Sequence, residues 1–353
     1  MNPLFILIGI AALGFLIVVH EGGHYFVARW CKMRIERFSI GFGPGLLKRT
    51  SKKTGTTFQL APIPFGGFVE IRGMNIAEEV DPEDRHAYPN RPVWQRFLTI
   101  FAGPATNYLS AIVIAFGLYL CHGRDVAYGY DVSEVMKGYD AYGKLESGDR
   151  IVALDHVPLH GDSGPSLAER VGQSGGKPLA LTVERGGQNR EIVLQPQQDK
   201  DPGGKPTWRI GVRYTAHYAV EGIGVSDAAW EALEYPVVQT RQIGKALYGI
   251  VFGSEKADMG GPVRMVEEFS KAFSAGTVYG IRLVMMLSVY LGLFNLLPIP
   301  ALDGGRLVFL VYEMVTRRRA NPEIETMVHM AGIMALGLVM LVVLYIDLRR
   351  FWT

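Results

Sequence analysis

The chain has 353 residues, enough for two or three domains, and a formal net charge of only +2. It carries no basic stripe with interleaved aromatic residues, which argues against nucleic acid as a partner. The two cysteines, Cys31 and Cys121, are too few for a disulfide framework or a cysteine-based zinc site. Apolar residues form long runs toward both ends, whereas the middle is rich in charge and glycine.

Four apolar segments are long enough to cross a lipid bilayer as helices, which takes about 20 residues each. They cover residues 4–27, 97–120, 278–297 and 327–346. The first has no basic start and no small-residue cleavage site after it, so we expect it to be retained rather than removed as a signal peptide. The sequence therefore predicts a mainly α-helical, multi-pass membrane protein.

Basic residues that flank the spans predict the orientation, because they concentrate on the cytoplasmic side. The connection between the third and fourth spans carries Arg317, Arg318 and Arg319, while Arg349 and Arg350 oppose this assignment weakly. The loop between the first two spans carries a larger cluster: Arg29, Lys32, Arg34, Arg37, Lys48, Arg49, Lys52 and Lys53. We expect both loops to be cytoplasmic, and both termini and the middle region to lie outside.

The first of these loops contains sequence typical of strands. Residues 34–42 and 56–71 are rich in β-branched and aromatic side chains and are punctuated by glycine and proline. The second stretch is apolar enough to enter the membrane, where its backbone needs protein or a wet cavity to satisfy it. A loop lying on the surface is the alternative, and the acidic residues 78–84 are expected to form a solvated loop.

The middle of the chain predicts a small α+β domain outside the membrane. Strand-like runs at residues 150–154, 179–184 and 191–194 surround a helix-like stretch at 166–173. Residues 145–155 resemble the core of a PDZ domain, and an unrelated small α/β domain is the alternative. Residues 226–276 then follow a pattern typical of amphipathic helices.

The first span ends in a motif with clear chemical meaning, His20-Glu21-Gly22-Gly23-His24. Residues four apart lie above one another on a helix, so His20 and His24 can reach one metal ion. Glu21 lies close enough to take a proton from a water molecule beside that metal. Such residues are costly in an apolar span and are therefore functional candidates, although a polar contact between helices is the alternative.

A catalytic zinc site needs a third protein ligand. Asp303 is the strongest candidate, because it lies in an apolar stretch where a carboxylate requires a cation, either a metal ion or Arg306. His329 and Asp347 are weaker candidates, since they begin and end the fourth span, and we expect His329 to be a membrane-edge residue.

Three motifs, at residues 20–24, 101–107 and 295–304, together resemble the site-2 protease family. Within it, the chain is most similar to the bacterial regulator-of-sigma-E protease branch. The resemblance implies a Zn²⁺ ion bound by His20, His24 and Asp303, with Glu21 as catalytic base. It also implies a membrane-entering β-loop and substrate contacts from Asn295, Phe65, Gly66, Gly67 and Phe68. Gly103, Pro104 and Asn107 are interpreted as packing of the second span beside the site.

The predicted organisation is a protease core interrupted by an insertion. Residues 1–122 and 277–353 form its two halves, residues 123–215 a single PDZ-like domain, and residues 216–276 an amphipathic helical connection. Some relatives in this branch carry two PDZ domains, and this chain has room for one.

The resemblance implies regulated intramembrane proteolysis in the bacterial cytoplasmic (inner) membrane. Expected substrates are single-span proteins already trimmed by another protease, such as anti-sigma factors or remnant signal peptides. One alternative is an inactive membrane adaptor that binds partners through the PDZ-like domain, but such a protein has no use for Glu21. A metal or proton transporter is a second alternative, yet the second and fourth spans offer few polar residues for a pathway.

Overall fold

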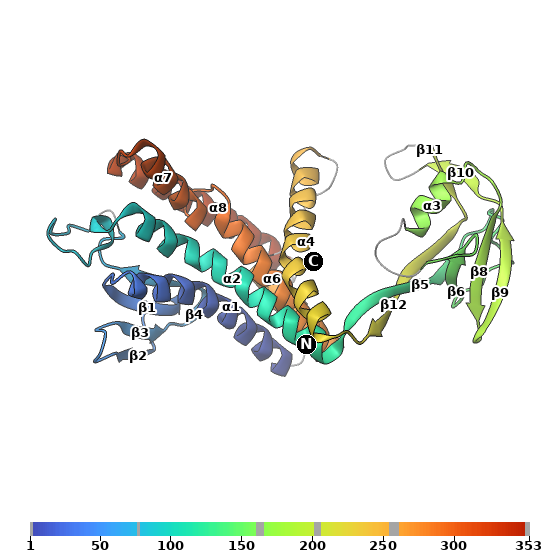
Figure 1. Cartoon of the computed structure of the whole chain (residues 1–353), viewed down its shortest axis with the longest axis horizontal. Coiled ribbons are helices and arrows are strands. Elements are labelled where there is room, and N and C mark those ends of the chain that lie inside the picture. Colours follow the sequence, from blue (N-terminus) through green and yellow to red (C-terminus); the bar gives the residue numbers. More distant parts are fainter. Residues whose placement is uncertain (1–2, 76–77, 160–165, 201–205, 254–260, 350–353) are drawn as a thin grey trace. The chain divides into compact units, whose positions relative to one another are not determined.

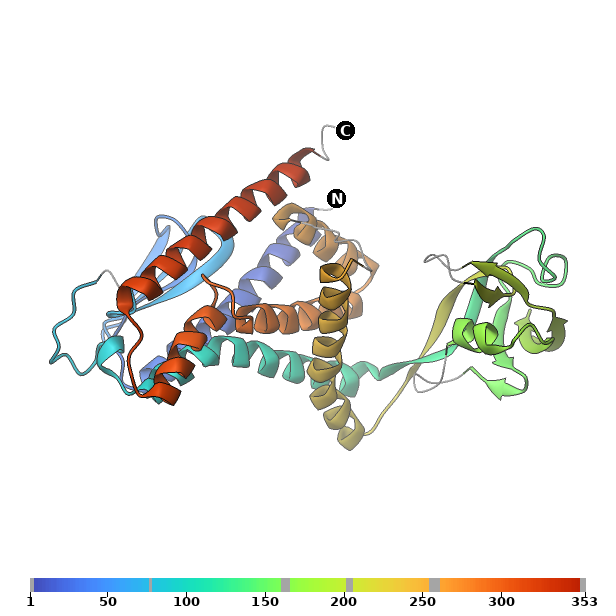
Figure 2. The same ribbon diagram turned by 90° about the horizontal axis from the view of Figure 1, so that it is seen from above.

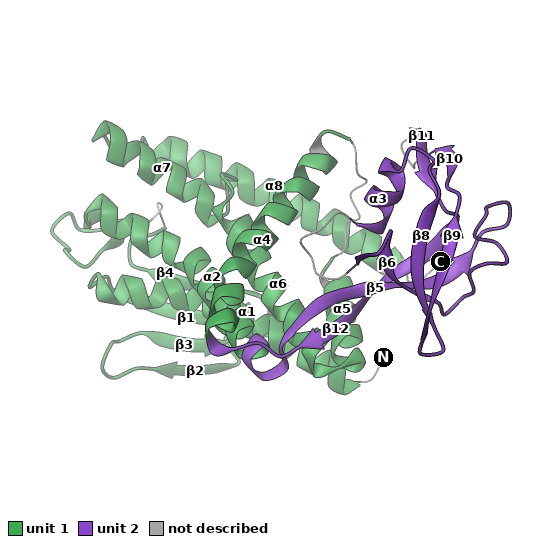
Figure 3. Cartoon of the chain, turned by 45° about the vertical axis from the view of Figure 1, so that its right-hand side comes forward, with its two compact units in different colours: residues 1–118, 226–353 green, residues 119–225 purple. Residues whose placement is uncertain are grey.

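The computed structural model describes residues 3–75, 78–159, 166–200, 206–253 and 261–349; side chains of residues 64–65, 251, 262–263 and 348 are excepted. The chain divides into two compact units (Figure 3). Unit 1 comprises residues 1–118 and 226–353, and unit 2 comprises residues 119–225.

Among the described residues, four helices are long and apolar enough to cross a membrane, and they coincide with the four predicted spans (Figure 1). They are α1 (Pro3–Trp30), α2 (Val93–His122), α6 (Thr277–Leu296) and α8 (Pro322–Arg349). Many of their large apolar side chains are exposed, among them Phe26 on α1 and Leu341 on α8. Such a surface suits lipid rather than water.

Shorter or more polar helices connect these spans. Residues 226–276 contain most of α4 (Val225–Val251) and all of α5 (Pro262–Ala275), and α7 (Asp303–Thr316) follows α6. Helix α5 begins with Pro262, a residue favoured in the first turn because its missing N–H would have no helical partner there. Its Phe269 is fully buried in a cluster with Leu16 and Val284, so α5 joins α1 to α6.

A four-stranded sheet lies beside α1 in unit 1 (Figures 1 and 2). Its strands are β1 (Ile35–Phe42), β2 (Leu47–Thr50), β3 (Thr57–Leu60) and β4 (Ile63–Ile71), in the order β2-β3-β1-β4. Strand β4 pairs antiparallel with β1 and lies at the edge of the sheet. Strands therefore form where residues 34–42 and 56–71 predict them, with a break at 61–62 that separates β3 from β4.

Unit 2 is built around one sheet with the strand order β12-β5-β6-β8-β9. These strands are β5 (Arg124–Val135), β6 (Arg150–Leu154), β8 (Leu179–Arg185), β9 (Gln188–Leu194) and β12 (Val212–Glu221). A short strand, β7 (Val157–Pro158), also pairs with β6. A separate pair is formed by β10 (Gln197–Lys200) and β11 (Pro206–Arg209). Helix α3 (Leu167–Gln173) starts with a capping box formed by Ser166 and Glu169. Its Leu167 and Val171 join the buried core of the unit.

One predicted boundary and the predicted fold class differ from the structure. Strand β12 continues past residue 215 to Glu221, because it pairs with β5 as far as Arg124. The description "mainly α-helical" fits the four spans, but the chain as a whole also contains substantial sheet in both units. The PDZ-like assignment of unit 2 stays a prediction.

Candidate metal centre

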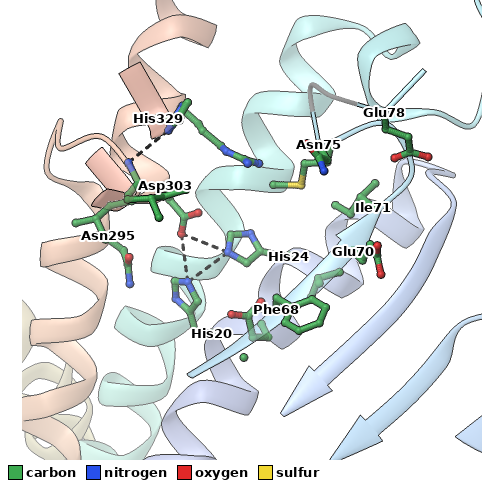
Figure 4. Close-up of a pocket in the computed structure, with 18 of the residues that line it drawn as sticks. His20, His24, Phe68, Glu70, Ile71, Asn75, Glu78, Asn295, Asp303 and His329 are labelled. Atoms are coloured by element: carbon green, nitrogen blue, oxygen red, sulfur yellow. Dashed lines mark hydrogen bonds and ion pairs between the residues drawn. The ribbon is translucent and has the colours of Figure 1, made fainter. Parts of the chain in front are cut away.

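The two histidines of the first motif lie one turn apart on α1, both largely buried, at 8% and 7% exposure for His20 and His24. Their Nε2 atoms are 3.3 Å apart. The i, i+4 spacing brings the rings to the same side of the helix, as the sequence predicts. Figure 4 shows both rings directed toward Asp303.

Asp303 reaches this point through a short loop, rich in proline, that separates α6 from α7. Pro298 and Pro300 have no N–H to continue the helix, and the segment closes through the hydrogen bonds Ile299 N–H to Leu297 O (2.7 Å) and Leu302 N–H to Ile299 O (3.2 Å). Helix α7 then begins at Asp303 itself. Its Oδ2 lies 3.2 Å from Nε2 of His20 and 3.3 Å from Nε2 of His24.

These three atoms fit a single zinc ion. Ligands at about 2.1 Å from a tetrahedral zinc are separated by about 3.4 Å, close to the observed 3.2–3.3 Å. Oδ2 of Asp303 is buried and receives no hydrogen bond within the described part of the chain. A buried carboxylate oxygen in that condition is costly unless a cation offsets its charge. His20, His24 and Asp303 could therefore hold a metal ion.

A cavity of about 650 Å³ opens beside the three donor atoms. Glu21 lines it without joining the cluster, and Val69 of β4 lines the same cavity. Asn295 of α6 also lines the cavity (Figure 4), and its Nδ2 donates to the carbonyl of Leu291 at 3.0 Å. The arrangement places a carboxylate and an amide beside the candidate metal position.

Strand β4 forms one wall of the cavity, from Gly67 to Ile71. Phe68 is part of this wall (Figure 4), and its ring stacks on that of Phe42, with ring centroids 6.4 Å apart. Gly66 is not among the lining residues, although it belongs to the same strand. The side chain of Phe65 lies outside the described residues.

The rival candidates occupy other places. The side chain of His329, which the sequence predicts at a membrane edge, is buried in the cavity wall, and its Nδ1 accepts a hydrogen bond from Ala301 N–H at 3.4 Å. Asp347 lies five turns further along α8 and accepts from Gly261 N–H at 3.2 Å. Neither residue belongs to the cluster that His20, His24 and Asp303 form among the described residues.

Glu78 also departs from its predicted setting. It was expected in a solvated loop, but it lines the cavity and accepts a hydrogen bond from Gly73 N–H at 2.8 Å. The contact draws the start of the acidic segment toward the site.

Two residues of α2 touch the histidines and are missed as site residues by the sequence analysis. The carbonyl of Thr99 is 2.8 Å from Nδ1 of His24, and the side-chain amide of Asn107 is 3.0 Å from Nδ1 of His20. Asn107 was interpreted as packing. Its i, i+4 spacing from Gly103 was the available signal, because it places both residues on one face of α2.

Comparison with known proteins agrees with this geometry. The model of peptidase family M50 matches residues 8–340. Three similar proteins carry the name "putative zinc metalloprotease". The one from Rickettsia conorii is 31% identical over 98% of both chains. Those from Brucella suis and Mesorhizobium japonicum are 34% and 32% identical, over 85% and 90% of this chain and 83% and 91% of theirs.

The match covers the second and third spans, most of the first and fourth, and the three motifs that include His20, His24 and Asp303. The chain therefore belongs to peptidase family M50, the site-2 protease family, and is a zinc metalloprotease of the membrane.

Proposed function

We propose that this protease hydrolyses peptide bonds within or near the transmembrane segments of single-span proteins. The observation that carries the proposal is the convergence of His20, His24 and Asp303 beside Glu21, in a cavity lined by apolar spans and a strand. Residues of α1, α6 and α8, three of the candidate spans, line the cavity, which suits substrates that reside in the bilayer.

In this proposal, His20, His24 and Asp303 hold the zinc ion, and Glu21 is the catalytic base. When bound, zinc supplies Lewis-acid activation of the scissile carbonyl and of the attacking water. Glu21 takes the proton from that water and passes it to the leaving amine. Glu21 lines the cavity beside the three donor atoms, which is the position that this transfer needs.

The free edge of β4 suits an extended substrate. A helical substrate hides its peptide bonds, so it must unwind before attack, and pairing with an edge strand satisfies its backbone inside the membrane. Gly67 allows close approach: a Cβ there would lie 2.7 Å from Ser39 O and 3.2 Å from Cγ of Glu21. Asn295, Gly66, Gly67 and Phe68, together with Phe65, remain the proposed substrate-contacting residues.

If the substrate adds to β4 as a strand, its ease of unwinding should control the rate. Helix-breaking Gly or Pro near the cleaved bond should speed cleavage, and an Ala/Leu-rich replacement should slow it. Gly67→Pro should reduce cleavage at least about tenfold, because proline removes an N–H and obstructs pairing, at a cost of one or two hydrogen bonds. Its Cβ would also press on Ser39 O, 2.7 Å away. The measurement is the cleavage rate of substrates matched in hydrophobicity.

The control is Lys52→Pro, which places a proline on the exposed turn between β2 and β3. Both variants should keep their zinc. Rates that ignore substrate helicity, together with normal cleavage by Gly67→Pro, would show that β4 only packs beside the site.

The proposed substrates are proteins already trimmed by another protease, such as anti-sigma factors and remnant signal peptides. The motif resemblance supports this class of substrate. Purified protein in detergent should contain zinc and cleave a single-span test substrate. An adaptor would bind such a protein without cleaving it, and a transporter would move metal across vesicles without cleavage.

We place the protein in the bacterial cytoplasmic (inner) membrane, with its termini and unit 2 outside. The support is the basic residues near β1 and β2 and at the end of α7, on connections assigned to the cytoplasm. In a Cys121→Ser background, an impermeant thiol reagent on intact cells should label Asn189→Cys in unit 2 but not Lys53→Cys in the β2–β3 turn. Both positions are exposed, so the reverse pattern would invert the assigned orientation.

A further inference from the structure

Helix α2 faces the two histidines with a pair of residues one turn apart, Gly103 and Asn107. A Cβ on Gly103 would lie 2.2 Å from Nε2 of His24, so only glycine leaves room for that ring. Asn107 is fully buried, and its side chain meets Nδ1 of His20 at 3.0 Å. The face that was interpreted as packing therefore contacts both rings.

The contact made by His24 fixes its tautomer. Its Nδ1 lies 2.8 Å from the carbonyl oxygen of Thr99, which can only accept a hydrogen bond. Nδ1 therefore carries the proton, and Nε2 presents its lone pair toward His20 and Asp303. A histidine that binds a metal through one nitrogen usually donates from the other in this way.

To bind a metal ion through Nε2, His20 must likewise carry its proton on Nδ1 and donate it to an acceptor. The Asn107 amide can be that acceptor in only one of its two orientations. With Nδ2 facing the ring, Nδ1 of His20 must accept, which puts the proton on the Nε2 that faces Asp303. In that orientation the buried Oδ1 of Asn107 also has no donor among the described residues. The two ends of an amide have nearly the same shape, so the reverse orientation fits the same space.

We propose that Oδ1 of Asn107 accepts the Nδ1–H of His20 and so directs the Nε2 lone pair to the metal position. Asn107 is a positioning residue, and α2 then provides both acceptors, this amide for His20 and the Thr99 carbonyl for His24. The inference rests on the proposed role of His20 as a ligand.

A second contact holds Asn107 in place. The hydroxyl of Ser288 on α6 donates to its main-chain carbonyl at 2.9 Å. The side-chain amide is thus carried on a segment of α2 that is tied to a neighbouring span, which limits its freedom to turn away from His20.

Removal of such an acceptor should weaken metal binding while the fold survives. Partners of this kind typically contribute 10–100-fold to metal affinity. Asn107→Leu keeps the size of the side chain and deletes the acceptor, so its zinc dissociation constant should rise by about 10–100-fold. Asn107→Asp keeps an acceptor oxygen and should bind zinc within about threefold of the original protein, since carboxylates commonly fill this role.

The experiment measures zinc affinity of the purified full chain by competition with a chelating indicator, together with thermal unfolding of the metal-free form. His20→Ala serves as the reference for loss of a ligand. Thr240→Val is the matched control, because it deletes a hydroxyl that pairs with Tyr108 of α2 at 2.9 Å and, within the described part of the chain, forms no hydrogen bond with either histidine.

Zinc affinity is expected to be highest, and similar, in three proteins: the wild type, Thr240→Val and Asn107→Asp. It should be lower in Asn107→Leu and lowest in His20→Ala. If Asn107→Asp binds zinc as poorly as Asn107→Leu, the amide donates rather than accepts and the inference is wrong. If both Asn107 variants bind as wild type does, Asn107 only packs. Zinc binding that survives His20→Ala would instead refute the proposed ligand set and leave the role of Asn107 without its basis.

Discussion

Glu21→Gln is expected to reduce cleavage by about a thousandfold or more while zinc stays bound. A positioned general base typically contributes 10²–10⁴-fold, and glutamine keeps the shape of the side chain but cannot take the proton. Glu21 lines the cavity and lies outside the donor cluster, so its loss should not open the metal site. The measurement is the turnover of a single-span substrate by purified protein, with zinc content determined on the same sample.

Glu323→Gln makes the same chemical change on the exposed first turn of α8 and should leave turnover as it was. Appreciable turnover by Glu21→Gln with its metal retained would remove Glu21 from its assigned role. Loss of zinc from that variant would show that the carboxylate takes part in binding the metal.

Asp303→Ala should lose both metal and activity. Without its carboxylate two histidines remain, and a two-ligand zinc site is weak and open. We expect the zinc dissociation constant to rise more than about 100-fold, beyond the effect of removing a supporting hydrogen bond. Metal analysis after dialysis against a weak chelator measures this directly.

Asp347→Asn tests the other buried carboxylate that the sequence offers as a ligand. Because Asp347 contacts Gly261 and lies apart from the cluster, this variant should keep its zinc. Full zinc occupancy in Asp303→Ala would exclude Asp303, and His329 in the cavity wall would be the next residue to replace.

The spans and the histidine pair were predictable from the sequence because each follows from a local rule. Twenty apolar residues define a span, and an i, i+4 spacing sets His20 and His24 on one side of a helix. Asp303 was predictable in part, since a carboxylate in an apolar stretch demands a cation. Its distance to the histidines depends on how α6, α7 and α1 pack, which no local pattern contains.

Other features of the site depend on how distant segments pack together, so the sequence alone does not predict them. His329 lies at the start of an apolar run, but α8 places it against the loop that ends at Asp303, so its side chain is buried in the cavity wall. Asn107 looks like a packing residue because the sequence does not say that α2 runs past the histidines. The edge position of β4 likewise comes from the strand order, since β1 pairs with β3 on one side and β4 on the other.

The donor set joins residues from opposite ends of the chain, His20 and His24 on α1 and Asp303 on α7. During translation, at about 5–20 residues per second, tens of seconds separate the synthesis of the two parts. A nascent chain whose first span is already inserted therefore lacks the carboxylate that completes the proposed site. The inserted first half would thus be unable to cleave membrane proteins until Asp303 has been synthesised.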